Sequence, residues 1–257
     1  LGLDYVYLCF DVNEETLPAA VAGLKTCGIR GFNLTMPNKN KIVELLDELS
    51  PEAQLIGAVN TVLNDNGKLI GYNTDGYGFM QSVRDAGHDI TGKNITVMGV
   101  GGASMAICAQ SALDGAASVH IFARRTSRYW NRTQKFAENL SAKTGCQVCL
   151  FDNDDHTALR DSIAQSYLLI NATSVGMVPD IDDTIIKDTS LFHPELVVAD
   201  VVYEPQETRL LREAKAAGCQ TFNGMYMLLH QGAKAFQIWT GQEMPVSVIK
   251  EKYFSVK

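Results

Sequence analysis

The central part of the chain alternates short apolar runs with longer segments of mixed polarity. The apolar runs have the length and composition of buried strands, and they cover residues 94–98, 118–123, 148–151, 167–171 and 196–202. Segments rich in helix-forming residues separate them or follow them, at residues 103–113, 133–143, 156–165 and 208–217. This alternation predicts an α/β fold with a doubly wound parallel sheet, covered by helices.

The first part of the chain shows the same rhythm with shorter elements. Strands are predicted at residues 5–10 and 31–34, and helices at residues 17–27 and 38–49. Two more strands, at 59–63 and 68–72, flank Asn66-Gly67, a pair that favours the tight turn of a hairpin. Amphipathic helices are predicted at 225–240 and 246–253. The pattern therefore predicts two α/β domains.

Charge and composition argue against nucleic-acid binding and against a membrane-spanning segment. The 257 residues carry a formal net charge of -7, so the basic footprint of a nucleic-acid-binding protein is missing. Glycines and polar side chains dilute the charge-free stretch 94–113, which fits a strand, a turn and a helix better than a membrane span. We expect neither nucleic acid nor membrane as a partner, and either a monomer or a homodimer.

The cysteines favour a structural role. Cys146 and Cys149 form a C-x-x-C pair, for which redox or metal chemistry is the alternative, but their neighbours are strand-like and no second pair follows. We predict no metal site. The other cysteines are scattered, as is typical of a protein in the reducing cytoplasm. The sequence begins at Leu1 rather than at methionine, and we expect a further segment before it.

A glycine-rich loop joins the first central strand to the first central helix. It has the sequence Gly99-Val100-Gly101-Gly102-Ala103-Ser104. In this setting Gly99 makes a tight turn, Gly101 lets a pyrophosphate approach the backbone, and the helix N-terminus attracts the anion. Ser104 stands where the dinucleotide fingerprint prefers glycine or alanine. The loop, with Gly102 and Ala103, predicts a dinucleotide site; the alternative is an ordinary turn between strand and helix.

The end of the next strand predicts which dinucleotide binds. An NAD site usually places an acid there to bind the ribose 2′-hydroxyl, but this strand runs into Ala123-Arg124-Arg125-Thr126-Ser127-Arg128. The guanidinium groups of Arg124 and Arg125 suit a 2′-phosphate, and Thr126 adds a hydroxyl donor. We therefore predict NADP, with NAD as a secondary cofactor. The alternative is a solvated loop that happens to be basic.

Four polar motifs stand near the predicted strand ends and indicate a small polyhydroxylated substrate. They are Asn33-Leu34-Thr35-Met36-Pro37-Asn38-Lys39, Ala58-Val59-Asn60-Thr61, Asn73-Thr74-Asp75-Gly76 and His230-Gln231-Gly232. Lys39 and Asp75 are the candidate acid/base pair, in which the carboxylate orients the amine. The alternatives are a surface lysine on a first helical turn and an ordinary turn or capping residue.

In this order the motifs resemble those of the shikimate/quinate dehydrogenase family. The glycine loop, Asn171-Ala172-Thr173-Ser174 and Gly176-Met177 match as well, so the resemblance covers nearly the whole sequence. It implies reversible reduction of 3-dehydroshikimate to shikimate, in some members also action on quinate, with Lys39 and Asp75 as the catalytic pair. It further implies the following contacts: Asn33, Thr35, Asn60 and Gln231 on substrate hydroxyls, Tyr203 facing the substrate, and Thr173, Gly224 and Met227 near the nicotinamide.

The resemblance also implies how the chain divides. A substrate-binding domain would take residues 1–76 and 225–257, and a Rossmann-type NADP-binding domain residues 77–224, with the join near Tyr77. Two features depart from the family pattern. No S-x-S segment for the substrate carboxylate is present, and Ala123-Arg124-Arg125 replaces the usual Asn-Arg-Thr. Two alternatives therefore stay open: a paralogue that uses NAD on quinate or an amino-shikimate, and a ligand sensor without catalysis.

Overall fold

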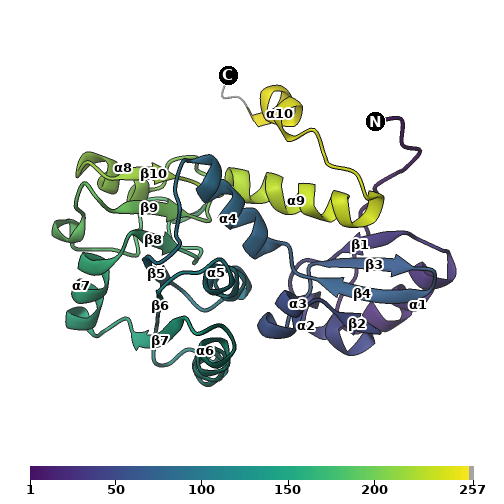
Figure 1. The fold of residues 1–257 in the computed structure, drawn as a ribbon, viewed down its shortest axis with the longest axis horizontal. Coiled ribbons are helices and arrows are strands. Elements are labelled where there is room, and N and C mark those ends of the chain that lie inside the picture. The colour runs from purple at the N-terminus through teal and green to yellow at the C-terminus, as the bar shows by residue number, and fades with distance from the viewer. Residues whose placement is uncertain (255–257) are drawn as a thin grey trace.

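The computed structural model describes residues 1–254, which form two sheets with two helices between them (Figure 1). The larger sheet has six parallel strands in the order β10-β9-β8-β5-β6-β7. Their bounds are β5 Asn94–Met98, β6 Ser118–Ala123, β7 Gln147–Asp152, β8 Leu168–Asn171, β9 Val197–Asp200 and β10 Gln220–Phe222. The chain runs outward from β5 in one direction and from β8 in the other. This order confirms the predicted doubly wound sheet and places a switch point between β5 and β8.

Helices cover both faces of this sheet because successive strand residues point to opposite sides. Ile95 and Val97 of β5 join the core beneath α5 (Gly102–Leu113) and α6 (Trp130–Thr144). Met98 joins the core on the other face, beneath α7 (His156–Gln165) and α8 (Arg209–Ala216). The two hydrophobic cores fix the strand ends, and the loops at those ends build the site described below.

The smaller sheet is mixed and has the order β1-β3-β4-β2. Its elements are α1 Leu17–Thr26, β1 Gly31–Asn33, α2 Asn38–Lys41, β2 Glu48–Leu49, α3 Pro51–Ile56, β3 Thr61–Asp65 and β4 Lys68–Tyr72. The hairpin predicted between β3 and β4 is confirmed: Asn66 and Gly67 both have positive φ, 54° and 92°.

Two predicted elements of this part are wrong. Residues 5–10 form no strand: they pair with no strand among the described residues, and most of their side chains are exposed. The helix predicted for 38–49 ends at Lys41, continues as a 3₁₀ turn (Ile42–Leu45) and gives way to β2. Backbone hydrogen bonds from Asp47 to Leu69 and from Ser50 to Gly71 hold this stretch at the sheet edge, so pairing overrides the helical preference.

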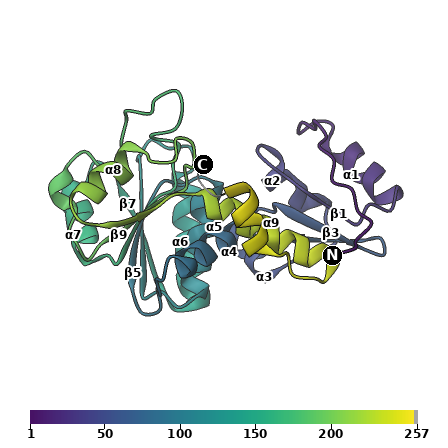
Figure 2. The same cartoon turned by 90° about the horizontal axis from the view of Figure 1, so that it is seen from above.

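Helices α4 (Asp75–Asp85) and α9 (Met225–Thr240) lie between the two sheets (Figures 1 and 2). They cross closely, because a Cβ added at Gly78 would lie 2.6 Å from the Gln231 backbone nitrogen. On another side of α4, a Cβ at Gly76 would lie 2.3 Å from the Ala106 carbonyl oxygen of α5. Beyond α9 the chain forms α10 (Val246–Ile249) and a π-helical turn, Lys250–Phe254. The join near Tyr77 stays a prediction.

Candidate active site

Lys39 and Asp75 form an ion pair at the edge of the smaller sheet. The Lys39 Nζ atom lies 2.7 Å from Asp75 Oδ2, and the two side chains are 20% and 11% exposed. Lys39 lies on the short α2, and Asp75 is the first residue of α4, where the free N–H groups of the helix favour a negative charge. The other carboxylate oxygen, Oδ1, accepts a hydrogen bond of 2.8 Å from Asn60 Nδ2. Both oxygens are therefore held, and the amine has a fixed position.

Asn60 is the centre of the buried network behind this pair. Its Oδ1 accepts hydrogen bonds from the Thr74 backbone nitrogen (2.9 Å) and from Thr61 Oγ1 (3.0 Å). Its Nδ2 lies 3.5 Å from Gln231 Oε1 of α9. The structure thus brings four sequence-predicted residues together, although Asn60 and Gln231 lie far apart in the sequence.

Asn33 and Thr35 lie at the border of this network. Asn33 Nδ2 donates to the Asn60 carbonyl and to Thr61 Oγ1, both at 3.0 Å, and Asn33 Oδ1 accepts from Tyr7 Oη at 2.8 Å. The bonds to Asn60 and Thr61 link β1 to the start of β3 through the Asn33 amide. Thr35 is exposed in the loop before Lys39 and donates to the Met36 carbonyl. Their contacts with substrate stay predictions.

The glycine loop has the geometry that its sequence predicts. Gly99 has φ 109°, and a Cβ there would lie 2.7 Å from Thr173 Cγ2, so the turn needs glycine. No atom lies within 4 Å of a Cβ added at Gly101 or Gly102, which leaves open space above the N-terminus of α5. Ser104 is fully buried and donates to the Gly99 carbonyl at 2.6 Å. Ser104, the residue that departs from the fingerprint, therefore links the start of the helix to the start of the glycine loop.

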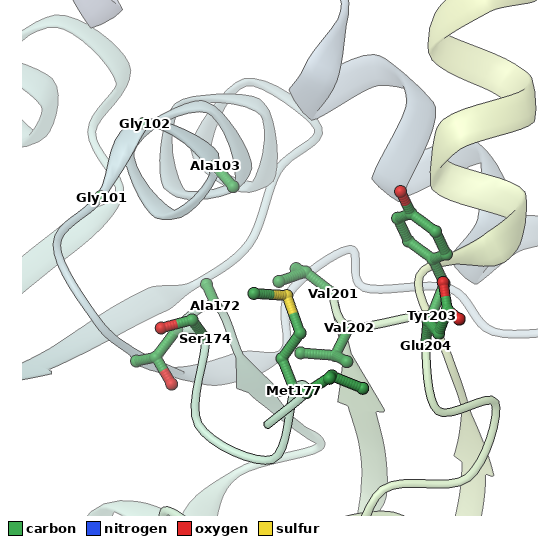
Figure 3. Close-up of a pocket in the computed structure, with 12 residues that line it drawn as sticks. Gly101, Gly102, Ala103, Ala172, Ser174, Met177, Val201, Val202, Tyr203 and Glu204 are labelled. Carbon is green, nitrogen blue, oxygen red and sulfur yellow. The ribbon is translucent and has the colours of Figure 1, made fainter. Parts of the chain in front are cut away.

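Two cavities meet at this loop. One, of about 900 Å³, extends along the ends of β6 and β7 and is lined by Arg124, Thr126, Ser127, Arg128 and Asn153. The other, of about 570 Å³, is mainly apolar and lies between Gly101–Ala103 and the ends of β8 and β9 (Figure 3). Both include Gly101, Ala172, Thr173 and Ser174, so the two cavities adjoin and together extend from a basic end to an apolar end. This is the shape that a nicotinamide dinucleotide requires.

The two predicted arginines have different surroundings. Arg124 is exposed and lines the larger cavity, together with Thr126. Arg125 instead stacks on Trp130, with its guanidinium carbon 4.7 Å from the ring centroid, and does not line the cavity. Asn153, which follows β7 and also lines the larger cavity, was not predicted as a site residue. Its Oδ1 is buried and has no hydrogen-bond partner. A polar residue at the end of a parallel strand was the available signal.

The apolar cavity includes two residues predicted from the family resemblance, Thr173 and Tyr203. Figure 3 also shows Met177, whose side chain points into the space between Ala172 and Val201. Two other predicted residues lie behind this wall. Gly224 caps the N-terminus of α9, and a Cβ added there would lie 2.0 Å from the Val201 carbonyl oxygen. Met227 packs against the main hydrophobic core.

A third cavity, of about 240 Å³, connects the two halves of the site. Lys39 and Asn73 line it on one side, and Gly101, Gly102 and Tyr129 line it on the other. Lys39 therefore lies across a shared space from the glycine loop. Within residues 1–254, no three His, Cys, Asp or Glu side chains are placed to hold a metal ion. No helix in that range is long and apolar enough to cross a membrane.

A doubly wound sheet with an open glycine loop, next to a lysine–carboxylate pair, defines a dinucleotide-dependent oxidoreductase. Comparison with known proteins identifies the family to which this oxidoreductase belongs. The family model of the shikimate dehydrogenase substrate binding domain matches residues 1–62, and that of the shikimate 5′-dehydrogenase C-terminal domain matches residues 224–252. The chain belongs to the shikimate dehydrogenase family.

Individual relatives agree with this assignment. A shikimate dehydrogenase (NADP(+)) of Listeria innocua is 52% identical over 99% of this chain and 87% of its own length. A quinate/shikimate dehydrogenase of Escherichia coli is 42% identical over 97% and 86%. The crystal structure of shikimate 5-dehydrogenase from Listeria monocytogenes in complex with shikimate and NAD has a TM-score of 0.95 and 51% identity, and the match covers 97% of this chain and 86% of that one.

Proposed function

We propose that the chain is an NADP-dependent dehydrogenase that reversibly reduces 3-dehydroshikimate to shikimate. The observation that carries this proposal is the Lys39–Asp75 pair, held by Asn60 and placed across a common cavity from the glycine loop. A ligand sensor has no need of such a proton-transfer pair, which disfavours the alternative without catalysis. The relatives named for shikimate and NADP(+) support the same substrate and cofactor.

The residues of the chain divide the chemistry between them. NADPH, when bound, supplies the hydride to the substrate carbonyl carbon. Lys39 donates a proton to the carbonyl oxygen, which becomes the product hydroxyl, and in the oxidising direction neutral Lys39 takes that proton back. Asp75 keeps the amine oriented through its bond of 2.7 Å, and Asn60 and Gln231 present amide groups to the substrate hydroxyls.

For the cofactor, we propose that Arg124, with Thr126, binds the 2′-phosphate. No acid replaces them at the end of β6, and both line the polar cavity. Quinate is a second substrate candidate, because the Escherichia coli relative is named for both acids.

The test follows NADPH or NADH formation at 340 nm with shikimate and with quinate, each against NADP and NAD. Turnover with shikimate and NADP is expected. A folded protein that binds NADPH but turns over neither acid with either cofactor contradicts the proposal.

A further inference from the structure

Asp200 is a buried carboxylate, and the loss of hydration on burial makes such a group unfavourable. It is the last residue of β9 and is completely buried. Burial raises its pKa, although three donors face the group. Oδ1 accepts from the Val202 backbone nitrogen (2.9 Å) and Asn171 Nδ2 (3.0 Å), and Oδ2 accepts from Thr208 Oγ1 (2.7 Å). Because burying a carboxylate without a cationic partner costs free energy, the presence of Asp200 at this position needs an explanation other than stability.

The network continues into the neighbouring strand end. Asn171 is the last residue of β8 and is also completely buried. Its Oδ1 accepts from the Thr173 backbone nitrogen (3.1 Å) and from Thr173 Oγ1 (2.6 Å), and its Nδ2 donates to the Val175 carbonyl (3.1 Å). Asp200 therefore binds the loop after β9 directly and the loop after β8 through Asn171.

These two loops are the walls of the apolar cavity. Ala172, Ser174 and Met177 come from one, and Val201 and Tyr203 from the other (Figure 3). Neither wall has regular secondary structure that would fix its backbone between residues 172–178 and 201–204. Backbone hydrogen bonds hold these loops at single points, for example from the Val201 nitrogen to the Asn171 carbonyl (2.9 Å). The side-chain hydrogen bonds of Asp200 and Asn171 reach both walls. The polar cavity along β6 and β7 is lined by residues 172–175 of the first loop and by none of residues 201–204 of the second.

We propose that Asp200 is a positioning residue that holds the two loops so that the nicotinamide end of the cofactor is oriented for hydride transfer, while the adenosine end binds independently of it. The proposal rests on the proposed function for the identity of the ligand. Asp200 touches neither substrate nor cofactor and acts through Asn171, Thr208 and the loop backbones. It is thus distinct from Lys39 and Asp75.

The test compares two ligands on Asp200→Ala, Asp200→Asn and Thr208→Val. NADPH carries the nicotinamide, whereas adenosine 2′,5′-bisphosphate carries only the adenosine half. We expect Asp200→Ala to weaken NADPH by about 10-fold, the scale of a lost hydrogen bond to a charged group, and to leave the bisphosphate within about twofold. kcat falls by a similar factor, whereas KM for shikimate stays near the wild-type value. Asp200→Asn, which keeps Oδ1, and Thr208→Val give smaller changes of the same pattern.

A matched control is Asp188→Ala, which removes an exposed carboxylate that accepts from the Ser190 backbone nitrogen at 3.0 Å, away from the cavity. This variant should bind both ligands normally. Equal weakening of NADPH and the bisphosphate by the Asp200 variants, or unchanged kcat and unchanged NADPH binding, overturns the proposal. If Asp200→Ala does not fold, Asp200→Asn and Thr208→Val test the proposal in the same way, by comparing the loss of NADPH affinity with the loss of bisphosphate affinity. If wild-type protein binds NADPH but does not oxidise shikimate, the proposed function falls, and the binding ratio still decides the role of Asp200.

Discussion

Replacing Lys39 by alanine removes the amine that the structure places next to Asp75. The Asp75 carboxylate keeps its bond of 2.8 Å from Asn60 and its position at the start of α4. The loss therefore leaves one partly satisfied carboxylate, and we expect the free energy of unfolding to fall by only about 1–3 kcal/mol. The dinucleotide cavity along β6 and β7 is not lined by Lys39, so NADPH binding should be retained.

The effect on turnover should be much larger. Loss of a general acid/base costs about 100-fold to 10,000-fold in rate, or roughly 3–5 kcal/mol of activation free energy. We expect kcat for shikimate oxidation with NADP to fall by at least about 100-fold, measured by absorbance at 340 nm. Small primary amines added to the Lys39→Ala protein should restore part of the rate, because the truncated side chain leaves room beside Asp75.

The control is Lys41→Ala, which removes an exposed lysine from the same short helix and should keep full activity. Melting curves and NADPH titration establish that the Lys39 variant is folded and binds cofactor. A folded Lys39→Ala protein whose kcat stays within about tenfold of wild type would refute the acid/base role, since that loss is below the range for such a group.

Three further outcomes are expected. Arg124→Ala should weaken NADPH about 10-fold to 100-fold and leave NADH nearly unchanged, because only NADPH offers the 2′-phosphate; equal losses in fluorescence titrations would contradict this. Gly78→Ala should lower stability by about 1–3 kcal/mol through its clash with the α9 backbone, whereas Gly23→Ala on the open face of α1 should raise it by about 0.5–1 kcal/mol; thermal melts that rank the two otherwise would count against the helix crossing. Burial lowers the pKa of His88, so the unfolded chain binds the proton more readily and stability is lost as pH falls below the ordinary histidine range; His88→Gln should make the decline of Tm between about pH 7 and pH 5 shallower, and an unchanged slope would exclude His88 as a contributor.

The central sheet was predictable because its strands are buried on both faces. Such strands appear as continuous apolar runs, and five of the six strands of the sheet were predicted within two residues. The sixth, β10, has only three residues, Gln220–Phe222, and lies at the sheet edge. A strand that short, with one exposed polar side chain, carries no periodic signal.

The errors in the first part of the chain have a common cause. The stretch 38–49 has a local preference for helix, but pairing with β4 and the complete burial of Ile42 decide its structure. Residues 5–10 have strand-like composition, yet composition does not supply a partner strand. In both cases the outcome depends on contacts with residues far along the chain, which no local window contains.

The candidate site was partly predictable for a similar reason. Motif order located Lys39, Asn60, Asp75 and Gln231, and the structure brings these together. It does not follow from any motif that Arg125 stacks on Trp130 rather than lining the cavity. Asp200 also gave no signal of its own, because its partner Asn171 belongs to another strand and lies 29 residues away in the sequence.

The crossing of α9 over the smaller sheet has a consequence for synthesis. Trp239 donates to the Val62 carbonyl at 2.9 Å, across a separation of 177 residues. At a translation rate of about 5–20 residues per second, the ribosome needs roughly 10–35 s to make the intervening chain. The contact between the smaller sheet and α9 must therefore wait for α9, whereas the whole six-stranded sheet emerges in between. A nascent chain should bind the cofactor before it is able to hold the substrate.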